Sequence, residues 1–287
     1  MVAADAPLLV VNADDLGMSP GINAAVFEGH DRGIVTSTSL MAAGPAFEAA
    51  VEGVRARPRL GCGVHLVLHD ERYLAPAERV PHLATADGKM RPLHPTVRAL
   101  LSGKIPEEEI EAEYGAQIER VLAAGIRPTH LDSHCHLHGF ARAGRVLHRL
   151  GRKHGIPWAR KPEVSGPADF RGSPVSRFPV AILISASHWR TRASIADPLR
   201  MPDRFLGLVR SGAMDEAWVE RTIEDLRGGE VSELVVHPGD GSGPPDADED
   251  HGPAARAKEL AAVLSPRVRA AIERRGVRLV SYAELPR

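Results

Sequence analysis

Short apolar runs alternate with longer stretches of helical periodicity along most of the chain. The runs predict buried strands at 8–12, 34–40, 60–68, 129–133, 156–160, 233–237 and 277–281. Helices are predicted between them, at 20–33, 45–57, 106–125, 140–154, 215–227, 254–264 and 266–275. Strands separated by helical crossovers favour a parallel sheet, so an α/β fold is expected. About seven parallel strands predict an irregular, TIM-like (β/α) barrel, with a doubly wound open sheet as the alternative.

Capping residues support the predicted helix boundaries. Ser19 and Pro20 supply an N-cap and a proline at the first helical position, and Ser265 is followed by Pro266 in the same way. The stretch 106–125 begins with a proline and three glutamates, keeps apolar residues at helical spacing and ends at a glycine.

The organisation of the chain predicts one domain over residues 1–287, because no internal repeat and no linker-like change of composition interrupts it. Two segments lack clear periodicity and are rich in Pro, Gly, Arg, Asp or Ser, namely 161–212 and 238–253. We expect both to be irregular lid or loop insertions. A further loop-rich stretch covers 69–105.

Composition narrows the class of protein. The 36 Lys and Arg residues nearly balance the 37 Asp and Glu residues, and the formal charge of −1 argues against a broad nucleic-acid-binding surface. No apolar run is long enough to span a membrane, and residues 1–5 lack the features of a secretory signal, so a cytoplasmic protein is expected. Two cysteines cannot form a disulfide framework. The sequence leaves a homodimer open.

The 14 histidines stand out in this otherwise average composition, and several of them follow predicted strands together with carboxylates. The strand-end residues are Asp14, Asp15, His65, the segment His130–His138 and His237. Loops after parallel strands build the active sites of α/β folds. Carboxylates and imidazoles that meet at one rim indicate a metal site or an acid/base site.

The segment His130–His138 carries a histidine or an aspartate at every second position. If the segment is extended, His130, Asp132, His134, His136 and His138 share one face. That face would be about 27 Å long at ~3.3 Å per residue, so only one or two of these side chains can bind the same ion. We expect the others, His136, His138 and Asp132 among them, to contact substrate or to orient the ligands.

The adjacent pair Asp14 and Asp15 can reach one site only where the strand breaks into its loop, because neighbouring strand residues point to opposite faces. Gly17 is compatible with such a break. One carboxylate could then anchor a divalent cation while the other acts as a general base on water.

Five ordered motifs resemble the YdjC/ChbG family of carbohydrate deacetylases. The motifs are Val11–Asn23, Gly33–Thr38, Gly63–Leu66, Thr129–His134 and Val236–Pro238. The resemblance runs from near residue 8 to Leu285 and is weakest over 161–212, while Leu16 and Cys135 depart from the usual family residues. The family implies an irregular TIM-like barrel of the glycoside hydrolase and deacetylase type. It also implies metal-dependent removal of acetyl groups from N-acetylated amino sugars such as chito-oligosaccharides.

Residue roles follow from the resemblance by position. It implies that Asp15, His65 and His134 bind one divalent cation, magnesium or zinc, and that Asp14 is the general base. His237 is the candidate general acid or oxyanion stabiliser. A related branch acts on acetylated glucosaminyl hopanoids, but its fourth motif differs from the Asp-Ser-His sequence found here.

The sequence leaves two alternatives to a sugar deacetylase. A His/Asp metal site could instead hydrolyse a phosphoester or a cyclic amide, although no arginine adjoins the motifs along the chain to clamp a phosphate. A non-catalytic sugar- or metal-binding protein is the other alternative, and the presence of a carboxylate at Asp14 argues against it.

Overall fold

The computed structural model describes residues 6–170, 173, 175–242 and 252–286. Its strands are β1 Leu8–Leu16, β2 Ser37–Leu40, β3 Gly61–Leu66, β4 His130–Ser133, β5 Trp158–Ala159, β6 Arg204–Leu206, β7 Val231–Val236 and β8 Arg278–Leu279. Its α-helices are α1 Pro20–Asp31, α2 Phe47–Arg55, α3 Leu93–Ser102, α4 Glu107–Ala123, α5 Ala141–Lys153, α6 Phe178–Ala193, α7 Glu216–Glu224, α8 Pro253–Leu264 and α9 Pro266–Arg275. Short 3-10 helices are η1 Ala77–Arg79, η2 His134–Gly139, η3 Pro167–Phe170 and η4 Val175–Arg177.

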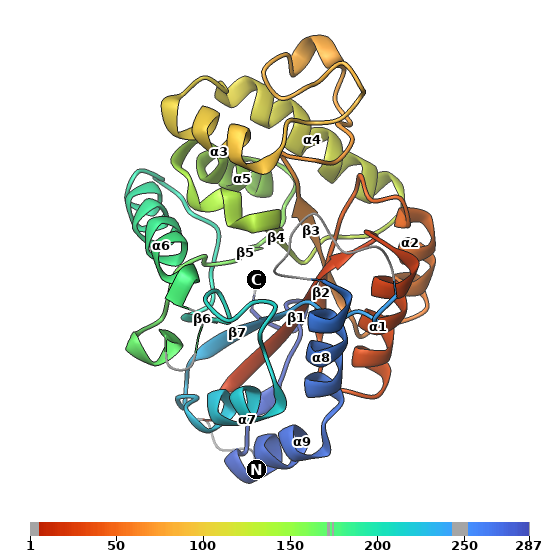
Figure 1. Cartoon of the computed structure of the whole chain (residues 1–287), viewed down its shortest axis with the longest axis vertical. Coiled ribbons are helices and arrows are strands. Elements are labelled where there is room, and N and C mark those ends of the chain that lie inside the picture. The colour runs from red at the N-terminus through yellow and green to blue at the C-terminus, as the bar shows by residue number, and fades with distance from the viewer. Residues whose placement is uncertain (1–5, 171–172, 174, 243–251, 287) are drawn as a thin grey trace.

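The strands form a curled parallel sheet with helices around it (Figure 1). Seven strands follow the order β5-β4-β3-β2-β1-β7-β6, and β8 pairs with the first residues of β1. An isolated bridge between Trp158 of β5 and Arg200, shortly before β6, links the two edges of the sheet. The predicted irregular (β/α) barrel is therefore confirmed, in a partly closed form.

The capping residues act as the sequence predicts. The Ser19 side chain accepts a hydrogen bond from the Ile22 amide at 3.2 Å, so α1 begins at Pro20. The Ser265 side chain caps α9 in the same way, and Gly276 follows that helix with a φ of 60°. A positive φ is available to glycine without a steric penalty, which explains why the helix ends there.

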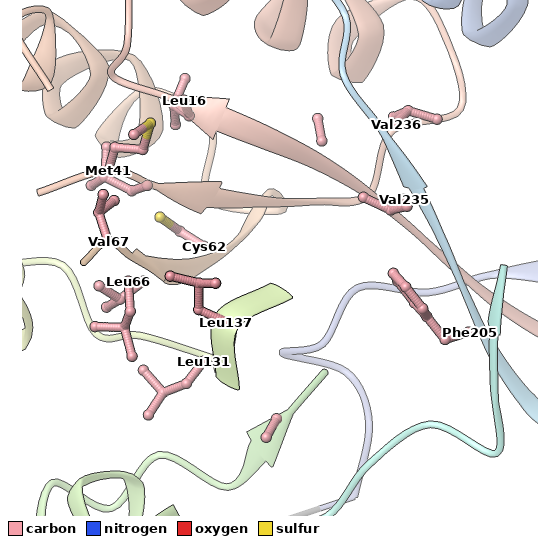
Figure 2. Close-up of a cluster of buried hydrophobic side chains, with 14 of the residues drawn as sticks. Leu16, Met41, Cys62, Leu66, Val67, Leu131, Leu137, Phe205, Val235 and Val236 are labelled. Carbon is pink, nitrogen blue, oxygen red and sulfur yellow. The ribbon is translucent and has the colours of Figure 1, made fainter. Parts of the chain in front are cut away.

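Buried apolar side chains from neighbouring strands form one cluster with apolar residues of the surrounding helices, and Figure 2 shows part of this cluster. The labelled strand residues are Leu16 of β1, Cys62 and Leu66 of β3, Leu131 of β4, Phe205 of β6, and Val235 and Val236 of β7. Met41, Val67 and Leu137 come from the segments that follow β2, β3 and β4. This packing fixes the strand ends relative to one another, which is what the site requires.

The segment 161–212 is not irregular, because it contains α6 and β6. The sequence concealed α6 because apolar residues lie on its exposed side as well as its buried side, which blurs the helical period. Ala181, Ile184 and His188 are buried, whereas Val180, Ile182 and Leu183 are exposed. The second expected insertion, 238–253, lies mostly outside the described residues.

The loop-rich stretch 69–105 likewise contains a helix, α3, that the sequence pattern did not predict. Among the described residues, every helix is too short or too polar to traverse a lipid bilayer.

Candidate active site

The predicted strand-end residues lie at the carboxyl ends of β1, β3, β4 and β7. Asp14 and Asp15 fall within β1, where the pairing register with β2 shifts between Ala13 and Leu16. Asp15 has a φ of 66°, which is uncommon for a residue with a side chain and interrupts the alternation of the strand. Both carboxylates therefore reach one site, as the adjacent pair predicted, although the break occurs at Asp15 itself.

Asp15, His65 and His134 converge, and we call them the inner group. One ligand atom from each lies within 4.8 Å of the others. Asp15 Oδ1 is 3.3 Å from His65 Nε2 and 3.2 Å from His134 Nδ1. This oxygen is buried and has no hydrogen-bond partner among the described residues. An unpaired carboxylate oxygen that faces two imidazole nitrogens matches the donor set of a zinc-type divalent cation, so the inner group fits a metal.

Asp132 orients His65 within the inner group. Asp132 Oδ1 lies 2.8 Å from His65 Nδ1, and its other oxygen accepts a hydrogen bond from the Ser39 hydroxyl at 2.6 Å. Asp132 holds the Nδ1 proton, so Nε2 is the nitrogen directed at the inner group and would give up its own proton to a cation, as in the carboxylate–histidine pairs of metal sites. Burial alone would lower the pKa of His65, but Asp132 and Asp14 outweigh it and raise the pKa to about 10. The same excess of negative charge favours a cation at this place.

Asp14 is held by Arg160, a residue that the sequence analysis missed. Arg160 Nη1 and Nη2 donate to the two oxygens of Asp14 at 2.6 and 2.7 Å. Arg160 is fully buried and also contacts Asp132 at 2.9 Å and Glu233 at 2.8 Å. Burial opposes ionisation of Asp14, yet Arg160 and His65 hold its pKa below the ordinary value. The position of Arg160 directly after β5 was the only signal available in the sequence.

A second arginine, Arg256 of α8, reaches Asp15. Its Nη2 lies 2.8 Å from Asp15 Oδ2, the oxygen that does not face the histidines. Burial would raise the pKa of Asp15, but Arg256 and His134 hold it well below the ordinary value. Although no arginine adjoins the motifs along the chain, folding brings two arginines into contact with their carboxylates. Each pairs with a site carboxylate, so neither resembles an arginine left open for phosphate.

His237 lies on the opposite side of Asp14 from the strands that carry the inner histidines. Its Nε2 is 3.8 Å from Asp14 Oδ2, and its Nδ1 is 3.1 Å from the Ser211 hydroxyl. Glu259 of α8 accepts a hydrogen bond from the His237 backbone amide at 2.6 Å. Ser211 and Glu259 were not predicted, and their contacts fix the ring beside Asp14.

The segment His130–His138 is not extended beyond Ser133. The prediction that its alternate residues share one face is therefore wrong after that point. The chain turns into η2, and Cys135 and His136 have φ values of 52° and 55°. Consecutive left-handed residues with side chains are unfavourable and indicate a constrained segment. His134 consequently turns toward Asp15, and its side chain keeps an exposed fraction of 20%.

His136 and His138 are both buried. His138 Nδ1 lies 2.6 Å from the Ser133 hydroxyl, and His138 Nε2 lies 3.3 Å from the Arg160 carbonyl oxygen. His136 packs edge-on against Phe205, and burial lowers its pKa to about 3. The contacts of Asp132 and His138 favour positioning, while a substrate contact for Asp132, His136 and His138 stays a prediction.

The family match covers most of the fold. A family model described as YdjC-like protein matches residues 8–274. The chain belongs to this family. The YdjC-like match begins at β1 and ends within α9, so it contains every residue of the site described above.

Proteins similar in sequence to this chain include enzymes named carbohydrate deacetylases. The chain is 31% identical over 275 residues to a carbohydrate deacetylase of Geobacillus stearothermophilus, covering 96% of each protein. It is 38% identical over 149 residues to a carbohydrate deacetylase of Halalkalibacterium halodurans, a match that covers 52% of this chain and 62% of that protein. A solved Enterococcus faecalis structure, provisionally described as a cellobiose-phosphate cleavage protein, has a TM-score of 0.75 at 27% identity. That alignment covers 98% of this chain and 100% of the other.

Proposed function

We propose that this protein is a metal-dependent hydrolase that removes acetyl groups from N-acetylated amino sugars. The observation that carries the proposal is the convergence of the inner group beside Asp14 and His237 at the carboxyl ends of four strands. The relatives named carbohydrate deacetylases support the choice of an acetyl group on a sugar.

The inner group would hold one divalent cation, magnesium or zinc. Two imidazoles and one carboxylate suit zinc, while an open site also accepts harder ions. When bound, such a cation would supply Lewis acidity and lower the pKa of a nearby water molecule. Arg256 donates a hydrogen bond to Oδ2 of Asp15, and Asp132 contacts Nδ1 of His65. Both ligands are therefore oriented before a cation binds.

Asp14 would act as the general base. Its Oδ2 faces the site, 3.9 Å from His65 Nε2 and 3.8 Å from His237 Nε2. Because Arg160 holds its pKa low, Asp14 is a weak base and can take a proton only from an acidified water. This weakness is the physical reason to expect that catalysis depends on the metal.

His237 would donate the proton that the departing amine requires. Hydrolysis adds water across the C–N bond: the hydroxyl joins the acetyl carbon, the C–N bond breaks, and the nitrogen gains a proton. Ser211 and Glu259 hold His237 across the site from the inner histidines. A base on one side of the scissile bond and an acid on the other match the two proton transfers of the reaction.

The test is acetate release. Protein reconstituted with zinc or magnesium is incubated with acetylated chito-oligosaccharides, and free acetate and free amine are measured together. Equal amounts of both products are expected, and the matched Asp14→Asn protein should release at least about 100-fold less. Failure to release acetate from any N-acetyl sugar tested would contradict the proposal.

A further inference from the structure

A second set of metal-ligand atoms adjoins the inner group. His69, His134 and Cys135, which we call the outer group, place one nitrogen or sulfur atom each within 4.8 Å of one another. His69 follows β3, whereas His134 and Cys135 belong to η2. His134 is thus a member of both groups. A thiol and two imidazoles are the softer donor set, which favours thiophilic cations such as Zn²⁺ and Cd²⁺.

His69 has the arrangement of a metal-binding histidine. Its Nδ1 lies 2.8 Å from Asp70 Oδ2, at the same separation that joins His65 to Asp132 in the inner group. Its Nε2 is buried and has no hydrogen-bond partner among the described residues, and the whole residue is only 3% exposed. Buried polar atoms are rarely left without a partner, because the loss of hydration is not repaid. With the proton on Nδ1, this Nε2 offers its lone pair to a ligand.

The two histidines of the outer group lie face to face. The rings of His69 and His134 are 5.1 Å apart between centroids, and their planes differ by 20°. Imidazole lone pairs lie in the ring plane, so stacked rings cannot both direct a nitrogen at one ion. His134 must therefore rotate to serve the outer group. This rotation would withdraw its Nδ1 from Asp15 and His65.

We propose that the outer group binds a thiophilic divalent cation and that this binding competes with the inner group for His134. A neutral imidazole has one lone pair, so His134 serves one ion at a time. The Cys135 thiol releases its proton to solvent when it becomes a ligand. Excess zinc would then inhibit the enzyme, and this consequence alone rests on the proposed function. Occupancy of the outer group does not.

Cadmium is the probe for the outer group, because a thiolate bound to Cd²⁺ gives an ultraviolet charge-transfer band. The full-length protein is titrated with Cd²⁺ alone, and the band is expected to appear. The band should vanish in Cys135→Ser. In His69→Gln the Cd²⁺ concentration that gives half of the full band should rise by about tenfold or more. A band that persists in Cys135→Ser, or that is unchanged in His69→Gln, would overturn the inference.

The chain supplies its own control in Cys62, the other cysteine. Cys62 is 3% exposed, and burial raises the pKa of its thiol to about 12. A Cys62→Ala protein should therefore keep the cadmium band of the wild type. Loss of the band in Cys62→Ala but not in Cys135→Ser would place the metal at Cys62 and overturn the proposal. Thermal unfolding of each variant checks that it is folded.

Acetate release gives the second readout. With an increasing excess of Zn²⁺, wild-type activity should fall while Cys135→Ser retains its activity. Equal inhibition of both proteins would overturn the competition for His134. If the wild type releases acetate and shows no cadmium band, the outer site fails and the proposed function stands. If the band appears without any deacetylation, the proposed function fails and the outer site stands.

Discussion

Asp14 and Asp15 are neighbours in the chain, yet each is held by its own arginine from a different side of the fold. Arg160 binds both oxygens of Asp14, whereas Arg256 binds only the oxygen of Asp15 that faces away from the histidines. Asp15 Oδ1 is therefore left for a cation, while Asp14 is fixed and kept ionised. The different roles proposed for these two identical side chains follow from their different partners.

This difference predicts separate effects of two substitutions on metal binding. Asp14→Asn should keep the bound metal and lose about 100-fold or more of its turnover, because the base is removed and the inner group is intact. His134→Ala should lose metal as well, because one of three ligands is removed. Metal content after dialysis, measured beside acetate release, separates the two variants. Equal loss of metal from both would contradict the division of roles.

Arg160 is a single buried cation among three carboxylates, Asp14, Asp132 and Glu233. Arg160→Met should lower the free energy of unfolding by about 3–5 kcal/mol, because it leaves buried negative charges uncompensated. Urea unfolding measures this loss. The control is Arg145→Met, which breaks the partly exposed pair with Glu107 and should cost less than about 1 kcal/mol. Similar losses in the two variants would contradict the role of Arg160 as the central counter-ion.

At the scale of elements, α6 supports η2, which carries His134. The Thr191 hydroxyl donates to the Gly139 carbonyl at 3.2 Å, and Ile184 packs against Gly139. A side chain at Gly139 would meet Ile184 at 3.1 Å, so this contact is close. The helix that the sequence pattern concealed therefore holds the end of the segment that supplies a predicted metal ligand.

Adjacent residues of α6 give a matched test of this support. Ile184→Ala should destabilise the protein by about 2–5 kcal/mol, because Ile184 is 6% exposed and its removal leaves a cavity beside η2. Leu183→Ala should stay within about 0.5 kcal/mol, because Leu183 is 44% exposed. Thermal or urea unfolding of both variants decides. Equal effects would mean that α6 does not pack on η2 as described.

At the scale of the whole molecule, the curl of the sheet gathers residues that are far apart in sequence. Asp14 lies 146 positions from Arg160, and Asp15 lies 241 positions from Arg256. Every one of these groups is buried in a region where charges interact strongly. The stability of the fold and the arrangement of the site are thus parts of the same network.

Acid should destabilise the whole molecule through its buried neutral histidines. Burial lowers the pKa of His148 to about 4, and its Nδ1 accepts a hydrogen bond from the Leu199 amide at 3.1 Å. The unfolded chain has the ordinary value of about 6.5 and so binds more protons between about pH 6.5 and 4. Stability from His148 is therefore complete above about pH 6.5 and is lost as the pH falls, at up to about 1.4 kcal/mol per pH unit.

Urea unfolding at several pH values between about 7 and 5 tests this linkage. His148→Gln should reduce the slope of the unfolding free energy against pH by up to about 1.4 kcal/mol per pH unit, which is the contribution of one proton. His94 is exposed, so His94→Gln serves as the control for the substitution itself and should change the free energy of unfolding by less than about 0.5 kcal/mol. An unchanged slope in His148→Gln would contradict the linkage.

The amino-acid sequence was sufficient to predict the alternation of strands and helices, and it placed Asp14, Asp15, His65, His134 and His237 at strand ends. These features are local, because periodicity, caps and strand ends are encoded by residues close together in the chain. The alternation therefore indicated a sheet of parallel strands and favoured a barrel over a doubly wound open sheet. The ordered motifs, taken together, indicated the family.

The partners of these residues depend on the folded arrangement of the chain. Arg160, Arg256 and Glu259 come from distant segments and carry no local motif, so their contacts with Asp14, Asp15 and His237 could not be predicted. The left-handed turn at Cys135 and His136 likewise replaces the extended strand that alternating residues suggested. Pairing and burial of charge depend on which segments the curled sheet brings together, and that is a property of the folded chain as a whole.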